Sequence, residues 1–299
     1  MNKGVISVLV AYLIWGLYPF YFHAMQHVAP AEIVIHRVLW TFALLAVYLF
    51  CSRRWRWIQK AVTDRRTVAV FLMSSVLITA NWSTYTYAIV TNQTLEASLG
   101  YFMNPLVSVL LGTVFLKEKL NKAQMLAIVF ACAGVMWVTF KQGEFPALGL
   151  TLALSFGFYG LVRKMAPLGS LEGLTLETAF AFPVALLATF YFAGNGDLTF
   201  VHGTSWDKFW LIMAGPITTI PLILFAYGLK QVPYSTVGFI QYLSPTMVFF
   251  IGLFFFGEEL QVNRLIGFIL IWAGVLIFVG ENFFRSHSGY RTEFNQLSK

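Results

Sequence analysis

The sequence predicts an all-α polytopic membrane protein, with ten transmembrane helices arranged as two inverted repeats of five helices. First, 58% of the 299 residues are hydrophobic and 11% are charged, which leaves too little charge to cover a surface in water. Second, apolar runs near the ~20 residues that cross a bilayer recur along the whole chain. Third, the two halves resemble each other at a constant shift of 140 residues, as internal repeats do.

Ten apolar segments are expected to span the membrane, and the short loops between them leave no room for a soluble domain. The first apolar run lacks a small-residue cleavage site, so we expect it to remain as a span rather than be removed as a signal peptide. Cys51 and Cys132 lie in or at the ends of apolar spans, and we expect neither a disulfide nor a metal site. The expected spans are residues 5–24, 32–51, 68–90, 95–116, 123–140, 147–162, 173–193, 208–229, 235–256 and 264–282.

The basic residues are distributed unevenly between the two sides of the membrane. With the N-terminus in the cytoplasm, 16 of the 20 Lys and Arg residues fall on the cytoplasmic side and 3 on the outer side. Such an excess marks the cytoplasmic face, so we expect both termini in the cytoplasm. The net charge of +7 then reflects topology, and we expect no nucleic-acid partner. The remaining basic residue, Arg37, lies inside the second span.

One basic segment interleaves tryptophan with arginine and lysine. It covers residues 53–67 and reads RRWRWIQKAVTDRRT. Tryptophan is enriched at membrane interfaces, and basic residues are attracted to anionic lipid headgroups. We therefore expect this segment to lie on the inner surface, in contact with the lipid bilayer.

The internal repeat is clearest between residues 104–120 and 244–260. Because five is an odd number of spans, the second copy must enter the membrane from the opposite side. We therefore divide the chain into a first repeat at 1–142, a second, inverted repeat at 143–284 and a cytoplasmic C-terminal tail at 285–299. Inverted repeats are typical of secondary transporters, whose substrate site lies near the midplane between the halves. The matched pairs are Pro105 with Pro245, Gly112 with Gly252, Phe115 with Phe255, Glu118 with Glu258, and Leu120 with Leu260.

Five motifs carry a resemblance to a known family. They read NWSTYTYAI (81–89), LEASLGYFMNPLVSVLLGTVFLKEKL (95–120), FGFYGLVRK (156–164), GPITTIPLILFAYG (215–228) and STVGFIQYLSPTMVFF (235–250). The chain resembles the RarD branch of the EamA family, within the drug/metabolite transporter superfamily, from Tyr12 to the end of the tenth span. The resemblance implies ten helices in two inverted repeats and a transporter of the bacterial inner membrane. Proteins of this branch are commonly labelled chloramphenicol-sensitivity or chloramphenicol-resistance permeases. That label is a weak indication of a physiological substrate.

Two prolines at membrane depth indicate where a substrate cavity lies. Pro105 and Pro245 fall near the middle of spans four and nine, and each frees the carbonyl four residues earlier, at Tyr101 and Gln241. Irregular backbone at this depth is tolerated where it lines a cavity or is buried in protein. We expect helix kinks at both prolines beside a cavity; a packing kink alone is the alternative. The expected lining residues are Trp15, Tyr18, Asn81, Trp82, Tyr85, Tyr101, Asn104, Tyr159, Gln241, Tyr242 and Ser244.

Charged residues near the outer ends of spans two and four predict an outer gate. Arg37 lies about two turns into span two. The predicted topology puts Glu32, His36 and Glu96 at a similar depth. Charges at membrane depth usually face the protein interior with a partner, so we expect these four residues to cluster. His36 is also a candidate proton carrier, although a neutral histidine bonded to Glu32 explains its presence equally well.

The second repeat predicts an inner gate. The position equivalent to Arg37 is Glu177, which the topology puts near the cytoplasmic surface, far from Arg37. We expect Glu177 to cluster there with Arg163, Lys164 and Lys230. Two other interpretations of these clusters remain open. The charge pairs can be static links between helices, or Arg37 can bind substrate directly.

These observations favour a secondary transporter that moves small organic metabolites or drugs, such as amphenicol-like compounds or amino acids, by alternating access. Export is the expected direction, and protons are candidate coupling ions. Since the sequence has no Walker motif, metal-ligand spacing or nucleophile constellation, we expect no cofactor and no enzymatic activity. The alternatives are a passive channel and a membrane-embedded enzyme acting on a lipid-linked substrate, with Glu32, His36 and Glu96 as its candidate site. The sequence leaves the oligomeric state open.

Overall fold

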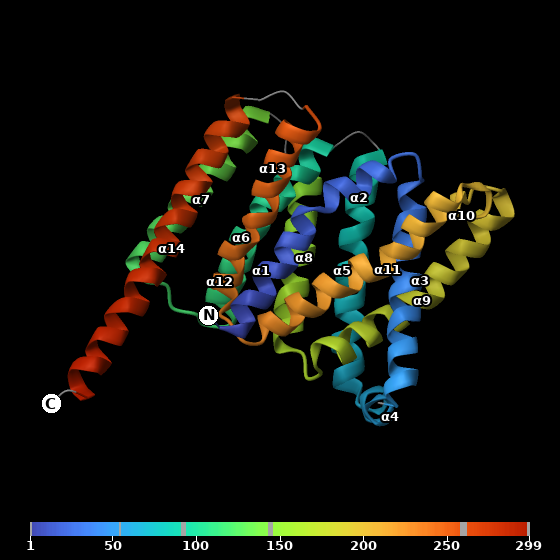
Figure 1. Ribbon diagram of the computed structural model, residues 1–299, viewed down its shortest axis with the longest axis horizontal. Coiled ribbons are helices and arrows are strands. Elements are labelled where there is room, and N and C mark those ends of the chain that lie inside the picture. Colours follow the sequence, from blue (N-terminus) through green and yellow to red (C-terminus); the bar gives the residue numbers. More distant parts are fainter. Residues whose placement is uncertain (1, 54, 91–93, 143–145, 258–261, 298–299) are drawn as a thin grey trace.

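The computed structural model describes residues 2–53, 55–90, 94–142, 146–257 and 262–297, and over these residues it is helical, without a strand. Figure 1 shows the helices running side by side between two ends of the molecule. Seven of them are long and apolar enough to cross a membrane, and two shorter apolar helices accompany them. The prediction of an all-α polytopic membrane protein is therefore confirmed.

The helix bounds follow the apolar segments that the sequence contains. The first half holds α1 (Lys3–Gly16), α2 (Tyr18–Ala24), α3 (Pro30–Ser52), α4 (Arg56–Thr63), α5 (Arg65–Val90), α6 (Thr94–Phe115) and α7 (Lys122–Gln142). The second half holds α8 (Ala147–Met165), α9 (Ser170–Asn195), α10 (Thr199–His202), α11 (Ser205–Leu229), α12 (Tyr234–Gln241), α13 (Leu243–Phe255) and α14 (Val262–Leu297). Most bounds lie within three residues of the expected spans, but α14 continues well past the expected end at residue 282.

Equivalent helices of the two halves make equivalent packing contacts. Helix α1 packs on α11 and α13, and its counterpart α8 packs on α5 and α6. Likewise, α3 packs on α11 while α9 packs on α5. In Figure 1 the chain rises through α1 and descends through α8, so the two halves are inverted. The last helices of the halves, α7 and α14, form a pair at one side of the molecule.

Two spans are interrupted near their middle, and both interruptions lie next to a proline. The span at 234–255 divides at Tyr242 into α12 and α13, with Pro245 in the first turn of α13. The first span divides at Leu17, and Pro19, which was not among the prolines expected to kink a helix, lies in the first turn of α2. Around Pro105, in contrast, α6 is a single helix. A proline thus coincides with an interruption in two spans but not in α6.

Small residues on α6 allow two different helices to approach it. A Cβ atom on Gly100 would lie 2.9 Å from the backbone oxygen of Gly149 on α8, and one on Gly112 would lie 3.2 Å from the nitrogen of Ser235 on α12. Close approach at small residues is typical of membrane helices. The small-residue face of α6 therefore joins the two halves of the molecule.

The short helices lie at the two ends of the bundle. Helix α4 lies at the end that carries the start of α1 and the end of α14 (Figure 1). Its Trp57 and Ala61 pack against Phe71 of α5 and Leu176 of α9. Helix α10 lies at the opposite end, beside α3 and α9. We call the end at α4 the closed end and the end at α2 and α10 the open end, for reasons given next.

Candidate functional site

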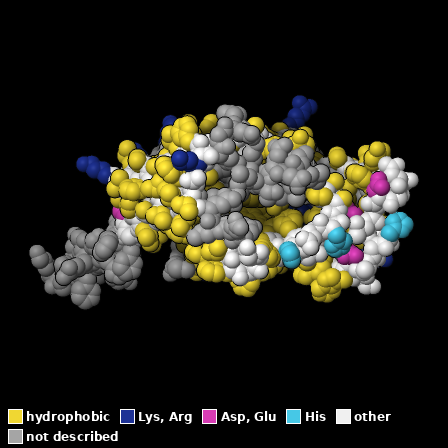
Figure 2. Space-filling model, turned by 90° about the horizontal axis from the view of Figure 1, so that it is seen from above, with side chains coloured by type: hydrophobic (Ala, Val, Ile, Leu, Met, Phe, Trp, Pro, Cys, Tyr) yellow, Lys and Arg dark blue, Asp and Glu magenta, His cyan; other side chains and the backbone are white. Residues whose placement is uncertain are grey.

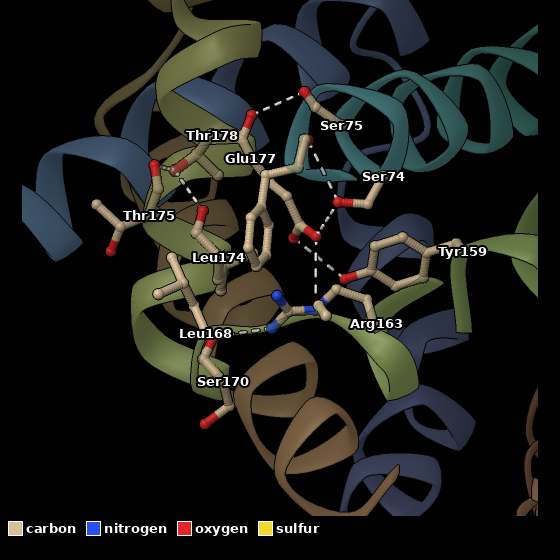
Figure 3. A network of polar contacts seen from close by, with 12 residues as sticks. Ser74, Ser75, Tyr159, Arg163, Leu168, Ser170, Leu174, Thr175, Glu177 and Thr178 are labelled. Carbon is tan, nitrogen blue, oxygen red and sulfur yellow. Dashed lines mark hydrogen bonds and ion pairs between the residues drawn. The ribbon is translucent and has the colours of Figure 1, made fainter. Parts of the chain in front are cut away.

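A buried ion pair joins α8 and α9 at the closed end. Arg163 Nε lies 3.4 Å from Glu177 Oε1, and each side chain is 1% exposed. Figure 3 shows the Glu177 carboxylate pointing down toward the guanidinium. Removing two charges from water costs several kcal/mol per ion, which is offset only when further hydrogen bonds satisfy the pair.

Further hydrogen bonds from three helices reach this pair, although Arg163 Nε and Nη1 are buried and have no hydrogen-bond partner among the described residues. Ser74 Oγ of α5 donates to Glu177 Oε1 at 2.5 Å, and the Tyr159 hydroxyl of α8 donates to Glu177 Oε2 at 3.3 Å. Arg163 Nη2 donates to the backbone oxygen of Ser170 at 2.9 Å. The carboxylate is therefore held between helices of both halves, which closes this end of the molecule.

Two lysines add a second set of links at the same end. Lys164 Nζ donates to the backbone oxygens of Leu229 at 2.7 Å and Val232 at 2.5 Å. Lys230 Nζ donates to the backbone oxygen of Ala166 at 2.8 Å. Both lysines therefore bind carbonyls at the C-terminal end of a neighbouring helix, where a positive charge is stabilised. Neither lysine forms an ion pair with Glu177.

Glu118 is a residue of the closed end that the sequence analysis did not include in a site. Its Oε1 accepts a hydrogen bond from the Tyr234 amide at 2.5 Å, and its Oε2 accepts one from the Ser235 amide at 2.8 Å. A carboxylate is stabilised at a helix N-terminus, so Glu118 ties the end of α6 to the start of α12. The repeated glutamate at positions 118 and 258 was the signal that could have identified it.

Polar groups accumulate at the interruption between α12 and α13. Ser108 Oγ of α6 donates to Gln241 Oε1 at 3.2 Å. Gln241 Nε2 and Asn104 Oδ1 are buried and have no hydrogen-bond partner among the described residues. An unsatisfied buried polar group costs about 1–3 kcal/mol. These two amides, with the buried hydroxyls of Tyr12 and Tyr242, are therefore among the polar groups that can still bind a ligand.

Arg37 lies on α3 and faces the open end. Its Nε donates to Thr218 Oγ1 of α11 at 3.0 Å. The guanidinium carbon lies 4.2 Å from the ring centroid of Trp82 on α5, a cation–π contact. The residue is 8% exposed. Arg37 therefore joins helices of both halves, but by a hydroxyl and an indole instead of a carboxylate.

Four tyrosines surround this guanidinium closely enough to interact with its charge. Three of them, Tyr18, Tyr85 and Tyr101, were expected to line a cavity, and Tyr21 was not. The rings of Tyr85 and Tyr101 lie 5.9 Å apart, and Tyr101 is 45% exposed. Figure 2 shows that the molecule, seen from this end, is hollowed over a hydrophobic surface. The structure thus gathers a charge, phenols and an indole at the hollowed end.

Glu32 and His36 have different surroundings from Arg37. The Glu32 carboxylate accepts hydrogen bonds from the amides of Thr199 at 2.9 Å and Phe200 at 2.7 Å, in the first turn of α10. His36 Nε2 lies 3.8 Å from Glu32 Oε1. The two residues therefore anchor α10. This contact could not be anticipated because α10 was not among the expected helices.

The protonation of His36 follows from its other ring nitrogen. Trp40 Nε1 donates to His36 Nδ1 at 2.9 Å, so Nδ1 carries no proton and the imidazole is neutral. The two roles expected for His36, a proton carrier or a neutral histidine bonded to Glu32, stay predictions. The side chain of Glu96 lies outside the described part of the chain, so its pairing with Arg37 stays a prediction.

The other residues expected to line a cavity lie in helix contacts. Asn81 Nδ2 donates to the Leu152 backbone oxygen and to Ser155 Oγ, both at 3.0 Å. Tyr159 belongs to the closed end, as described above. Tyr242 is buried beside α7 and α14, Trp15 packs among the aromatic rings of α1, α8 and α11, and Ser244 is partly buried on α13.

A helical membrane protein of two inverted halves, closed at one end and hollowed at the other, has the architecture of a membrane transporter. The model of the EamA-like transporter family matches residues 2–140 and again 146–280, and the chain belongs to this family. Its relatives place it in the RarD branch of the drug/metabolite transporter superfamily.

Several proteins are similar along nearly their whole length. Protein RarD of Escherichia coli is 36% identical over 93% of this chain and 94% of its own. The uncharacterized transporter YojE of Bacillus subtilis is 40% identical over 93% of each chain. The chloramphenicol-sensitive protein RarD of Pseudomonas aeruginosa is 27% identical over 92% and 93%. A solved crystal structure superposes with a TM-score of 0.68 at 14% identity, over 92% of this chain and 98% of the other, which shows the shared fold.

Proposed function

We propose that this protein is a secondary transporter that moves small organic metabolites or drugs across the bacterial inner membrane by alternating access, and that it works as an exporter. The observation that carries the proposal is the difference between the two ends. Arg163 and Glu177 close one end with charges that are each 1% exposed, whereas the molecule is hollowed over a hydrophobic surface at the other end (Figure 2). A carrier opens to one side at a time, so one closed end is the expected arrangement.

The distribution of basic residues supports one orientation of the protein in the membrane. The closed end carries the start of α1, the end of α14 and α4, and most Lys and Arg residues fall on that side of the expected topology. The positive-inside rule then supports a cytoplasmic closed end with both termini in the cytoplasm. In this orientation the protein is open to the outside, the state in which an exporter releases its substrate.

Opening toward the cytoplasm requires the links at the closed end to separate. We propose Arg163, Glu177, Lys164 and Lys230 as the inner gate, together with Glu118. We propose Arg37 and Glu96 as residues that approach each other when the outer end closes. Ionic contacts that form in one state and break in the other supply the two barriers that alternating access needs.

Counterflow in proteoliposomes tests the proposed function. Vesicles containing the purified protein are preloaded with an unlabelled solute, and uptake of the same labelled solute is followed with and without a pH gradient. The panel includes chloramphenicol, amino acids and aromatic carboxylates. A carrier accumulates label transiently, whereas a channel only equilibrates it. Absence of protein-dependent exchange for every solute would contradict the proposal.

A matched variant distinguishes the protein's activity from leakage. Replacing Gly173 with Ala brings a methyl group against Arg163 and disturbs the inner gate, whereas Gly194 on the same helix has no neighbouring atom within 4 Å. We expect Gly194→Ala to exchange solute at the rate of the unaltered protein and Gly173→Ala to alter that rate. Equal rates in both variants would mean that the closed end takes no part in transport.

A further inference from the structure

The guanidinium of Arg37 keeps unused hydrogen-bonding capacity at the open end. Its Nε donates to Thr218 Oγ1 at 3.0 Å, and the Tyr18 hydroxyl lies close enough to interact with the guanidinium, which leaves further N–H groups that can donate to a ligand. Within the described part of the chain, no carboxylate oxygen lies within 4.0 Å of this guanidinium, since the ion pairs found there involve other residues. A cation at membrane depth ordinarily has a partner, and an anionic ligand can supply it.

The neighbours of Arg37 orient the guanidinium without neutralising it. The indole of Trp82 lies under the guanidinium, with the guanidinium carbon 4.2 Å from the ring centroid. Thr218 holds Nε. Glu32, the acidic residue one turn earlier on the same helix, already accepts two backbone hydrogen bonds from α10, at 2.9 and 2.7 Å. The terminal nitrogens form a planar fork, the geometry that matches a carboxylate, and they make no ion pair with a described carboxylate.

The residues around Arg37 also restrict the rest of a ligand whose carboxylate binds the guanidinium. Tyr18, Tyr85 and Tyr101 lie within electrostatic reach of Arg37 and present aromatic faces and hydroxyl groups. The described residues supply one positive charge at this point, so a singly charged carboxylate neutralises it, whereas a phosphate dianion leaves a surplus negative charge at membrane depth. A ligand with an aromatic body can pack against the tyrosine and tryptophan rings.

We propose that Arg37 binds the carboxylate of a monoanionic substrate that has an aromatic body. This inference rests on the proposed transport function, because it names the substrate class for the same hollow. Arg37 then acts as the anchor for the substrate in the outward-open state, with Trp82 and Thr218 as positioning residues for the guanidinium.

Direct binding to the purified protein in detergent tests the inference without a transport measurement. Benzoate, phenylacetate and 3-phenylpropionate are each compared with the corresponding neutral amide, which has nearly the same shape but no charge. We expect each acid to bind roughly tenfold or more tightly than its amide, as a charge-assisted hydrogen bond predicts. Phenyl phosphate and phenylalanine are included, and both are expected to bind more weakly than 3-phenylpropionate.

Variants at Arg37 connect this preference to one side chain. Arg37→Met is expected to weaken binding of 3-phenylpropionate by roughly 10- to 100-fold and to leave the affinity for the amide nearly unchanged. Arg37→Lys keeps the charge but loses the planar fork, so an intermediate loss is expected. Lys141→Gln is the matched control, because Lys141 also stacks on an indole, 5.0 Å from the ring centroid of Trp137, but on α7. It is expected to bind like the unaltered protein.

The outcomes separate this inference from the proposed function. Equal affinity of acid and amide in every pair overturns the inference, and this comparison needs only the unaltered protein if Arg37→Met fails to fold. Tighter binding of phenyl phosphate or of phenylalanine also overturns the stated substrate class. If the acids bind in a way that depends on Arg37 but no solute shows counterflow, the binding site is supported and the proposed transport function is contradicted. Counterflow of neutral solutes that is unaffected by Arg37→Met supports the transporter and contradicts the anchor.

Discussion

The two ends of the molecule hold a membrane-depth arginine in contrasting ways. Arg163 at the closed end lies 3.4 Å from Glu177, and the carboxylate has two further donors on other side chains. Arg37 at the open end has the hydroxyl of Thr218 and the face of Trp82, but no carboxylate among the described residues. The pair at the closed end links helices, whereas the arginine at the open end keeps hydrogen bonds available for a ligand.

The contrast is informative because Arg37 and Glu177 occupy equivalent places in the two repeats. Arg37 lies where α3 packs on α11, and Glu177 lies where α9 packs on α5. One repeat therefore has a cation at this place and the other an anion. The anion, Glu177, pairs with Arg163 on the preceding helix of its own half, α8. The two arrangements should therefore contribute differently to the free energy of unfolding.

The largest effect is expected from breaking the buried pair. Arg163→Met leaves the Glu177 carboxylate buried without its cation, which is expected to lower the free energy of unfolding by about 3–5 kcal/mol. Adding Glu177→Gln to the same chain removes the unpaired charge and is expected to recover much of that loss. Titration with SDS in mixed micelles measures both values. Additive losses in the double variant would show that the two side chains do not act as a pair.

A smaller effect is expected at the glycine that makes room for this pair. A Cβ atom on Gly173 would lie 1.8 Å from Arg163 Nη1 and 2.5 Å from Phe71 Cε1, so Gly173→Ala must displace one of them. Overpacking of this kind costs about 1–3 kcal/mol. Gly194→Ala on the same helix, with no atom within 4 Å, is the control and should be neutral or slightly stabilising. The same SDS titration compares them, and equal stability of the two variants would contradict the tight packing at Gly173.

Loss of the carboxylate that caps α12 is expected to cost less again. Glu118→Ala leaves the amides of Tyr234 and Ser235 without their acceptor, which lowers the free energy of unfolding by about 0.5–2 kcal/mol. Hydrogen exchange of the amides at the start of α12 should increase in this variant and remain unchanged at the start of α13. Unchanged exchange at both places would show that Glu118 is not the effective cap.

The smallest effect is expected for the predicted contact between Arg37 and Glu96. Interhelical polar contacts in membranes average about 0.6 kcal/mol, so the coupling between Arg37→Ala and Glu96→Ala in a double-mutant cycle should be of that order. The cycle is measured by thermal unfolding in detergent, with and without 3-phenylpropionate, because a bound carboxylate should reduce the coupling. Strict additivity without the ligand would rule out the pairing.

Local patterns in the sequence were sufficient to predict the helices and the inverted arrangement of the two halves. Hydropathy located the spans because each apolar segment of membrane length must satisfy its own backbone hydrogen bonds as a helix. Constant spacing of residues such as Pro105 and Pro245 revealed two halves, and an odd number of spans per half required their inversion. Some of the expected site residues lie close together, namely Arg37 with Trp82 and three tyrosines, and Glu177 with Arg163, and their roles stay predictions.

Contacts between helices distant in the chain could not be derived in the same way. The sequence grouped Glu32 with Arg37 because they lie close on one helix, but the fold directs Glu32 to the amides of α10 and Arg37 to α11 and α5. Asn81 likewise looked available for a ligand until packing put the Leu152 carbonyl within 3.0 Å. The sequence by itself determined which segments cross the membrane and in which order. Tertiary structure decided which charges are neutralised and which remain available, since that depends on what the neighbouring helix presents.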